Sequence, residues 1–210
     1  MKTFSDFITE LRNPKEISDF KKDVKSTMNG VDTRNNDWRA NLSKYMGAHG
    51  FSFLGSGKYA SVYGNPKYSY VIKVFMRDSA YQRWLDFCLK NKDNKHVPKI
   101  KGKVIKISND VFAIRLEKLT PLKQDLRRGD FGNAYYEWEN DNSYKSDDKD
   151  INDILEFFSK NKNLIDIHSE NIMMRGNVDV VVDPFYNFVK VKDGKAIFSI
   201  DPNEEIPGLF

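Results

Sequence analysis

Two oxygen-bearing side chains flank a short apolar stretch late in the sequence. Asn171 comes before a run of hydrophobic residues, and Asp183 follows a run of valines. If the Gly-Asn pair at 176–177 is a two-residue hairpin turn, Asn171 lies opposite Val182, and Asp183 sits one step beyond it. Amide and carboxylate oxygens beside phosphate groups suit Mg²⁺, which takes one or two protein ligands plus phosphate oxygens and water. The sequence therefore predicts that Asn171 and Asp183 bind Mg²⁺.

A third acid lies in the segment that leads into this hairpin. Asp166 precedes Asn171 in a polar run that also contains His168. From such a loop, a carboxylate could accept the proton of an attacking hydroxyl group or orient that group. The alternative is that Asp166 and His168 are ordinary turn residues that bond to their own backbone.

A glycine-rich turn lies between two expected strands. It contains Gly55, Ser56, Gly57 and Lys58, and Ala60 follows. Glycines let a backbone approach phosphate groups and offer N–H donors without steric obstruction. The segment is not a Walker loop, because no Gly-Lys-Ser/Thr sequence precedes a helix. The alternative is a simple hairpin turn.

Lys73 interrupts a run that is otherwise apolar, Tyr70–Phe75. A lysine in such a strand points to solvent on a half-exposed face, or it is buried and binds an anion. The second interpretation gains weight because a hairpin would return the chain from the glycine-rich turn to a place beside Lys73.

The elements around these residues indicate an α+β protein. Alternating runs separated by turn signals predict an antiparallel sheet of five strands. We expect one helix after the third strand, with Asp78 or Ser79 as its N-cap. The expected strands are 51–54, 61–63, 70–75, 99–107 and 111–116.

The remaining segments divide into expected helices, a loop and a hairpin. Apolar stripes within residues 1–50 predict a helical extension, and Ile151–Phe158 fits an amphipathic helix. Residues 127–150 are polar and mixed, which favours a loop or insertion. A second hairpin is expected around 193–194. We expect His49 and His96 to be solvated turn residues and Cys88 to pack in a helix face.

Composition limits the class of protein and its partners. The 34 basic residues nearly balance the 30 acidic ones, which gives a net charge of +4 and forces no nucleic-acid partner. No stretch approaches the ~20 apolar residues of a membrane span. The single cysteine excludes an internal disulfide framework and fits a reducing compartment. We expect a cytoplasmic protein that binds neither a membrane nor nucleic acid directly.

Taken together, the motifs resemble the protein-kinase signature set in the same order: the glycine-rich turn, Tyr-Val-Ile-Lys73, Asp166 with Asn171, and Asp183. His168, two residues after Asp166, is closer to the loop of aminoglycoside-phosphotransferase-like kinases. In more detail, residues 50–205 look like the early serine/threonine kinases of T-odd (T-seven-type) bacteriophages. That family implies an enzyme made early in infection that phosphorylates host proteins in the host cytoplasm.

The resemblance also implies a two-lobed kinase-like fold and a set of residues that bind ATP and Mg²⁺. The lobes would be 51–119 and a reduced, partly helical 120–210 with β-hairpins, after a helical extension over 1–50. Lys73 would hold the α- and β-phosphates, Asp166 would be the catalytic base, and Asn171 and Asp183 would bind the metal. The other ATP-binding positions would be Gly55, Ser56, Gly57, Lys58, Ala60, Val62, Val71, Glu117 and Leu119.

The sequence departs from the kinase pattern in two ways. Only aspartates could replace the helix glutamate that normally pairs with the strand lysine, and Asp86 is the least unsuitable of them. Asp183 is followed by Pro-Phe, and no regulated activation loop follows it. Two alternatives therefore stay open: a nucleotide-binding inhibitor that acts by contact, and a small-molecule phosphotransferase.

Overall fold

The computed structural model describes most of the chain after residue 36. The described residues are 22, 37–57, 59–76, 78–107, 111–123, 125–185, 189–192 and 195–198. The apolar stripes expected before residue 30, as well as Lys58 and the expected turn at 193–194, lie outside them. The chain divides into two compact units, one containing residues up to Arg77 with Lys101–Lys118, the other Asp78–Ile100 with Leu119–Leu209.

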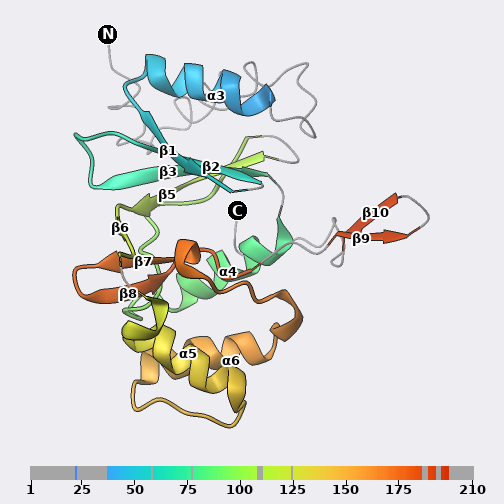
Figure 1. Ribbon diagram of the computed structural model, residues 1–210. Helices are drawn as coiled ribbons and strands as arrows, with labels where there is room; N and C mark the ends of the chain where they lie inside the picture. The colour runs from blue at the N-terminus through green and yellow to red at the C-terminus, as the bar shows by residue number, and fades with distance from the viewer. Residues whose placement is uncertain are drawn as a thin grey trace. The chain divides into compact units, whose positions relative to one another are not determined.

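The first unit is built on an antiparallel sheet of five strands in the order β1-β2-β3-β5-β4 (Figure 1). This confirms the expected α+β class and five-stranded sheet. The expected strand at 99–107 is wrong in extent, because only Ile105–Lys106 form a regular strand. Gly102 has a φ of 91°, a left-handed conformation that extended strands do not adopt. The strands are β1 Ser52–Ser56, β2 Ala60–Gly64, β3 Tyr70–Met76, β4 Ile105–Lys106 and β5 Val111–Glu117.

One face of this sheet is covered by helix α3, Asp37–Ala48. Leu42 and Met46 of α3 are fully buried in a cluster that includes Ile72 and Val74 of β3. Side chains alternate along a strand, so Lys73 points to the opposite face. Lys73 is also buried, at 7% exposure. The strand that carries the lysine is therefore enclosed on both faces, and the half-exposed strand of the alternative interpretation is not observed.

The described part of the second unit contains three α-helices. Asp78 caps the first by accepting a hydrogen bond from the backbone N–H of Tyr81, as expected. Asp148 caps the third by accepting from the backbone N–H of Asp150. Cys88 is buried in the first helix, as predicted. The helices are α4 Ser79–Lys90, α5 Asp130–Asn140 and α6 Lys149–Ser159.

The prediction of a loop over 127–150 is wrong, because α5 occupies its centre. Phe131, Ala134, Tyr135 and Trp138 are buried at helical spacing along α5. Gly132 and its polar neighbours have low helix propensity and conceal this pattern in the sequence. The packing of the apolar face stabilises the helix in spite of these residues.

Two hairpins complete the second unit. Strands β6 Thr120–Pro121, β7 Ile172–Arg175 and β8 Val178–Val181 form one small sheet. Strands β9 Val189–Lys192 and β10 Lys195–Phe198 pair as the expected second hairpin. Short 3-10 turns occupy Leu126–Arg128, Lys162–Leu164 and Ser169–Asn171.

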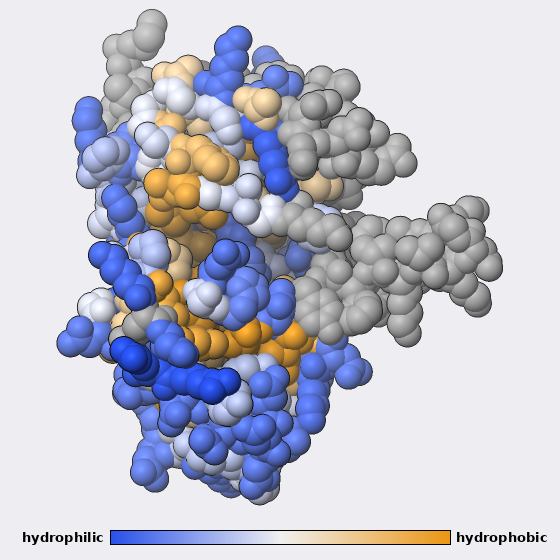
Figure 2. Space-filling view, viewed as in Figure 1, coloured by the Kyte–Doolittle hydropathy of each residue, from blue (hydrophilic) through white to orange (hydrophobic). Residues whose placement is uncertain are grey.

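The surface around α5 and α6 is mostly hydrophilic (Figure 2). This agrees with the sidedness of α6, whose Ile151, Ile154, Leu155 and Phe158 are all buried. Among the described residues, every helix is too short or too polar to cross a membrane.

Replacing Leu42 with alanine tests whether α3 is part of the first unit. The Leu42→Ala variant removes a fully buried side chain and should lower the free energy of unfolding by about 2–5 kcal/mol. Denaturant unfolding measures this change, and the exposed Lys44 on the same helix provides Lys44→Ala as a control. Equal stability of the two variants would contradict the packing of α3 on the sheet.

Candidate functional site

The β7–β8 hairpin has the register that the sequence predicts. Gly176 adopts a φ of 62° in the two-residue turn, and Ile172 pairs with Val181. The backbone N–H of Val182 donates to the carbonyl of Asn171 at 2.9 Å, which extends the pairing by one step. Asn171 and Asp183 are thereby brought to the same end of the hairpin.

Asp166 is tied to the same place by its backbone. Its N–H donates to the carbonyl of Pro184 at 2.7 Å, and Ile165 forms an isolated bridge with Phe185. The segment before Asn171 therefore runs antiparallel to the segment after Asp183. The backbone bonds therefore bring Asp166, Asn171 and Asp183 to the same end of the hairpin within the second unit.

The side-chain amide of Asn171 has a defined orientation. Its Nδ2 donates to the backbone carbonyl of Asp166 at 2.7 Å. A carbonyl oxygen can only accept, so the amide nitrogen must occupy this position. The Oδ1 atom of Asn171 is then the end that can face a cation.

The oxygens of Asn171 and Asp183 fit the chemistry of a magnesium site. Both residues are half-buried, and both offer the hard oxygen ligands that Mg²⁺ prefers. A cluster of three His, Cys, Asp or Glu side chains that could hold a metal by themselves is not found among the described residues. The donor set therefore fits an ion whose remaining ligands come from a bound phosphate and water.

His168 lies beside these residues and also has a local role. Its Nδ1 accepts from the backbone N–H of Glu170 at 3.3 Å, as expected for a turn residue. Its Nε2 lies 2.8 Å from Nδ2 of Asn171 and 3.8 Å from Oδ2 of Asp166. The Asp166 side chain is 44% exposed, so a substrate hydroxyl group can reach it.

The first unit gathers another set of the expected residues on one face of its sheet. Lys73 pairs across the sheet with Val62 of β2 and with Ile114 of β5. Cross-strand partners share a face, and Val71 lies on that face by alternation. Ala60 pairs with Phe75, which places it there too. Lys73 thus shares the face away from α3 with these four apolar residues.

The glycine-rich turn closes the β1–β2 hairpin. The N–H of Gly57 donates to the carbonyl of Ala60 at 3.1 Å, and Ser56 pairs with Ser61. A Cβ atom added at Gly55 or Gly57 would meet no other atom within 4 Å. The packing of the chain therefore does not require glycine at either position, which is compatible with space kept for a ligand.

Sequence reasoning missed Arg39, which contacts this turn. Its guanidinium donates to the carbonyl of Gly57 at 2.7 Å, so a residue of α3 holds the glycine-rich turn. The helical stripe around Leu42 indicated α3, but no local pattern linked its polar face to a turn that follows much later in the sequence.

The other expected positions have simpler environments. Asp86 forms an ion pair with Lys90 at 2.7 Å along α4. Glu117 ends β5 opposite Tyr70, and Leu119 directly precedes β6. The adenine-binding role of Glu117 and Leu119 stays a prediction.

Comparisons with known proteins give low similarity. No family model and no curated protein matches the chain. Among solved structures, it is similar to Rad53 residues 1–466 in complex with AMP-PNP, with 12% identity and a TM-score of 0.37. It is also similar to the kinase domain of PF14_0431, with 21% identity and a TM-score of 0.30.

The matches cover 74% and 71% of this chain, which spans less than half of either structure, 44% and 46%. Similarity at this level carries no argument about activity.

The register of the β7–β8 hairpin can be tested at Gly176. A Cβ there meets no atom, so Gly176→Ala isolates the strain of the left-handed φ and should destabilise the second unit by about 1–2 kcal/mol. Gly47 also has open space but lies in α3, and Gly47→Ala should stabilise the first unit by about 0.5–1 kcal/mol. Denaturant unfolding compares the two, and the same sign for both would refute the assignment of the turn.

Proposed function

We propose that this protein is a phosphotransferase that moves the γ-phosphoryl group of ATP to serine or threonine hydroxyl groups of proteins. The observation that carries the proposal is the convergence of Asp166, Asn171 and Asp183 at one end of the β7–β8 hairpin, through the bonds from Val182 N–H and Asp166 N–H. A general base and two oxygen ligands are the groups that phosphoryl transfer requires at the reacting end of ATP.

Asp166 would act as the base in this reaction. The hydroxyl oxygen of the acceptor bonds to the γ-phosphorus, the bond from that phosphorus to the β,γ-bridging oxygen breaks, and ADP leaves. The hydroxyl proton passes to the carboxylate of Asp166, which is exposed enough to receive it. Asn171 and Asp183 would hold Mg²⁺, which neutralises charge on the phosphates when it is bound.

The first unit would bind the nucleotide. Lys73 is buried on the same face of the sheet as Val62, and it would hold the α- and β-phosphates when ATP is bound, as the sequence resemblance implies. Val62 and Val71 flank it and offer apolar contact to a base. Arg39 holds the glycine-rich turn through the carbonyl of Gly57, and the N–H groups of the turn would donate to phosphate.

The nature of the acceptor rests on the sequence resemblance alone. That resemblance supports a protein substrate in an infected host cell, with transcription, RNA-processing or defence proteins as candidates. A direct role for nucleic acid or a membrane is not proposed.

A small-molecule acceptor is the second candidate, and His168 favours it. The imidazole lies close to both Asp166 and Asn171, an arrangement that the sequence shares with aminoglycoside-phosphotransferase-like kinases. Mass spectrometry of the phosphorylated product separates the two candidates, since one predicts phosphate on protein hydroxyl groups and the other on a metabolite or drug.

Replacing Asp166 tests the proposed reaction. Asp166→Ala should lower kcat by about 10²–10⁴-fold, because a general base contributes that much, while ATP binding stays within about twofold. Transfer of labelled phosphate from ATP measures the rate, and Glu170→Gln in the same loop is the matched carboxylate control. A rate for Asp166→Ala equal to that of the control would exclude Asp166 as the base.

A further inference from the structure

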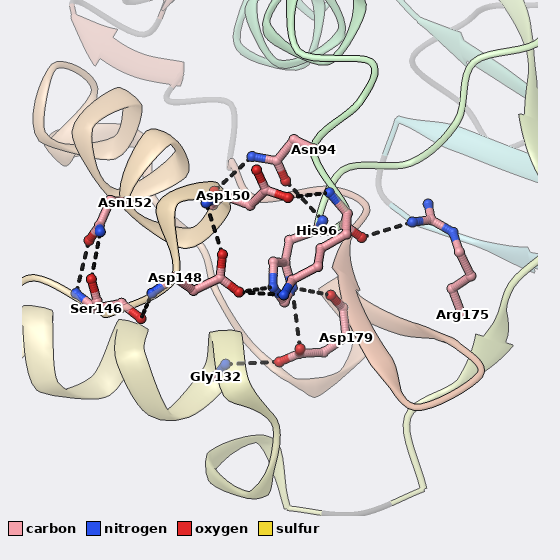
Figure 3. Close-up of polar contacts among 10 residues, drawn as sticks. Asn94, His96, Gly132, Ser146, Asp148, Asp150, Asn152, Arg175 and Asp179 are labelled. Carbon is pink, nitrogen blue, oxygen red and sulfur yellow. Dashed lines mark hydrogen bonds and ion pairs between the residues drawn. The ribbon is translucent and has the colours of Figure 1, made fainter.

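The loop after α4 is bonded to the β7–β8 hairpin along both of its strands (Figure 3). Arg175 of β7 donates to the carbonyls of Lys95 and Val97 at 2.8 and 2.9 Å. From β8, the N–H of Val181 donates to the carbonyl of His96 at 2.9 Å. Three hydrogen bonds to the backbone of residues 95–97 therefore fix the hairpin that carries the candidate metal ligands.

His96 lies at the centre of this junction, and the prediction that it is solvated is wrong. It is 0% exposed, and both ring nitrogens face acceptors. Nδ1 lies 2.7 Å from the backbone carbonyl of Asp179 and 3.4 Å from its Oδ1. Nε2 lies 3.4 Å from Oδ2 of Asp148. Because a carbonyl only accepts and a carboxylate attracts a donor, this geometry suits a ring that carries a proton on both nitrogens.

The two carboxylates have other partners that hold them in place. Asp148 pairs with Lys95 Nζ at 2.6 Å while its Oδ1 caps α6. Oδ2 of Asp179 accepts from the backbone N–H of Gly132 in α5 at 3.0 Å. A Cβ at Gly129 would collide with this same carboxylate. The junction is therefore enclosed by α5, α6 and β8, and it requires glycine where α5 approaches Asp179.

The surrounding charges favour the protonated ring. Burial lowers the pKa of His96, but hydrogen bonds to Asp179 and Asp148 outweigh it, so the pKa lies above its ordinary value of 6.5. Burial raises the pKa values of Asp179 and Asp148, yet hydrogen bonds from His96 and other donors bring both below the ordinary 3.8. The charged groups that the contacts and electrostatics place around the junction include Lys95, Asp130, Asp148, Asp150, Arg175 and Asp179.

We propose that His96 is a positioning residue: its charged imidazole, bound between Asp148 and Asp179, holds the β7–β8 hairpin and so sets the place of Asn171 and Asp183. The effect of His96 on Mg²⁺ binding and catalysis rests on the proposed function. The effect of His96 on the position of the β7–β8 hairpin does not.

The sign of the pH dependence follows from the direction of the shift. Because the pKa of His96 is raised in the folded protein, its charge stabilises the fold completely below pH 6.5. This stabilisation is lost as the pH rises through the pKa that His96 has in the folded state. Asp179 and Asp148 have lowered pKa values and act in the opposite direction. Their contribution to stability is lost only as the pH falls below 3.8. The hairpin should therefore loosen on the alkaline side.

NMR titration of the wild-type chain tests the structural part directly. Ring signals of the three histidines and amide signals of Asp179 and Val181 are followed from about pH 5.5 to about pH 9. We expect the ring of His96 to titrate above 6.5 and the two amides to change with the same midpoint. A ring that titrates at or below 6.5, or amides that do not follow it, would overturn the proposal.

Variants test the catalytic part. His96→Gln should raise the Mg²⁺ concentration for half-maximal phosphoryl transfer by about 10–100-fold, the usual effect of removing a group that orients a metal ligand. Loosening of the hairpin should lower the wild-type rate on the alkaline side, and His96→Gln should abolish this decline. His49→Gln is the matched control, since His49 lies in the first unit, where its Nδ1 bonds to the carbonyl of Tyr45.

An unchanged Mg²⁺ dependence in folded His96→Gln would contradict the positioning role. If His96→Gln does not fold, the wild-type titration still decides the structural part. Absence of phosphoryl transfer by the wild type would count against the proposed function alone, because the NMR titration does not depend on catalysis.

Discussion

The left-handed turn at Gly176 determines which residues of the second unit can act together. It fixes the pairing of β7 with β8, and a slip of one residue would turn the side chains of a strand to the other face. With the observed register, Asn171 precedes β7 and Asp183 follows β8 at the same end. The bond from Asp166 N–H to Pro184 adds the third group. The proposed chemistry depends on this one backbone geometry.

Each of the two units buries an ionisable side chain. In the second, His96 is enclosed by two carboxylates. Oδ2 of Asp148 also pairs with Lys95, and its Oδ1 accepts from the N–H of Asp150, while Oδ2 of Asp179 accepts from the N–H of Gly132. The charges of this junction are therefore compensated within the protein, which suits a structural role. In the first unit, Lys73 is buried on the face of the sheet that also carries Val62 and Ile114.

Much of the fold and of the candidate site could be predicted from the sequence, wherever the local sequence pattern and the local geometry agree. The Gly176 turn, the Asp78 cap and the strand around Lys73 follow from turn signals, capping and alternation. Long-range contacts could not be predicted in this way. The burial of His96 depends on side chains far along the chain, and α5 depends on packing that overrides its poor helix propensity.

The most direct test of the account is to locate the metal. Mn²⁺ is added in place of Mg²⁺ to labelled protein, together with a non-hydrolysable ATP analogue. The Mn²⁺ ion should broaden the NMR signals of the residues near it. The account predicts that broadening is strongest at Asn171 and Asp183, extends to Asp166, and requires the nucleotide. Broadening centred elsewhere, or none at these residues with the analogue bound, would contradict a metal–nucleotide site at the end of the hairpin.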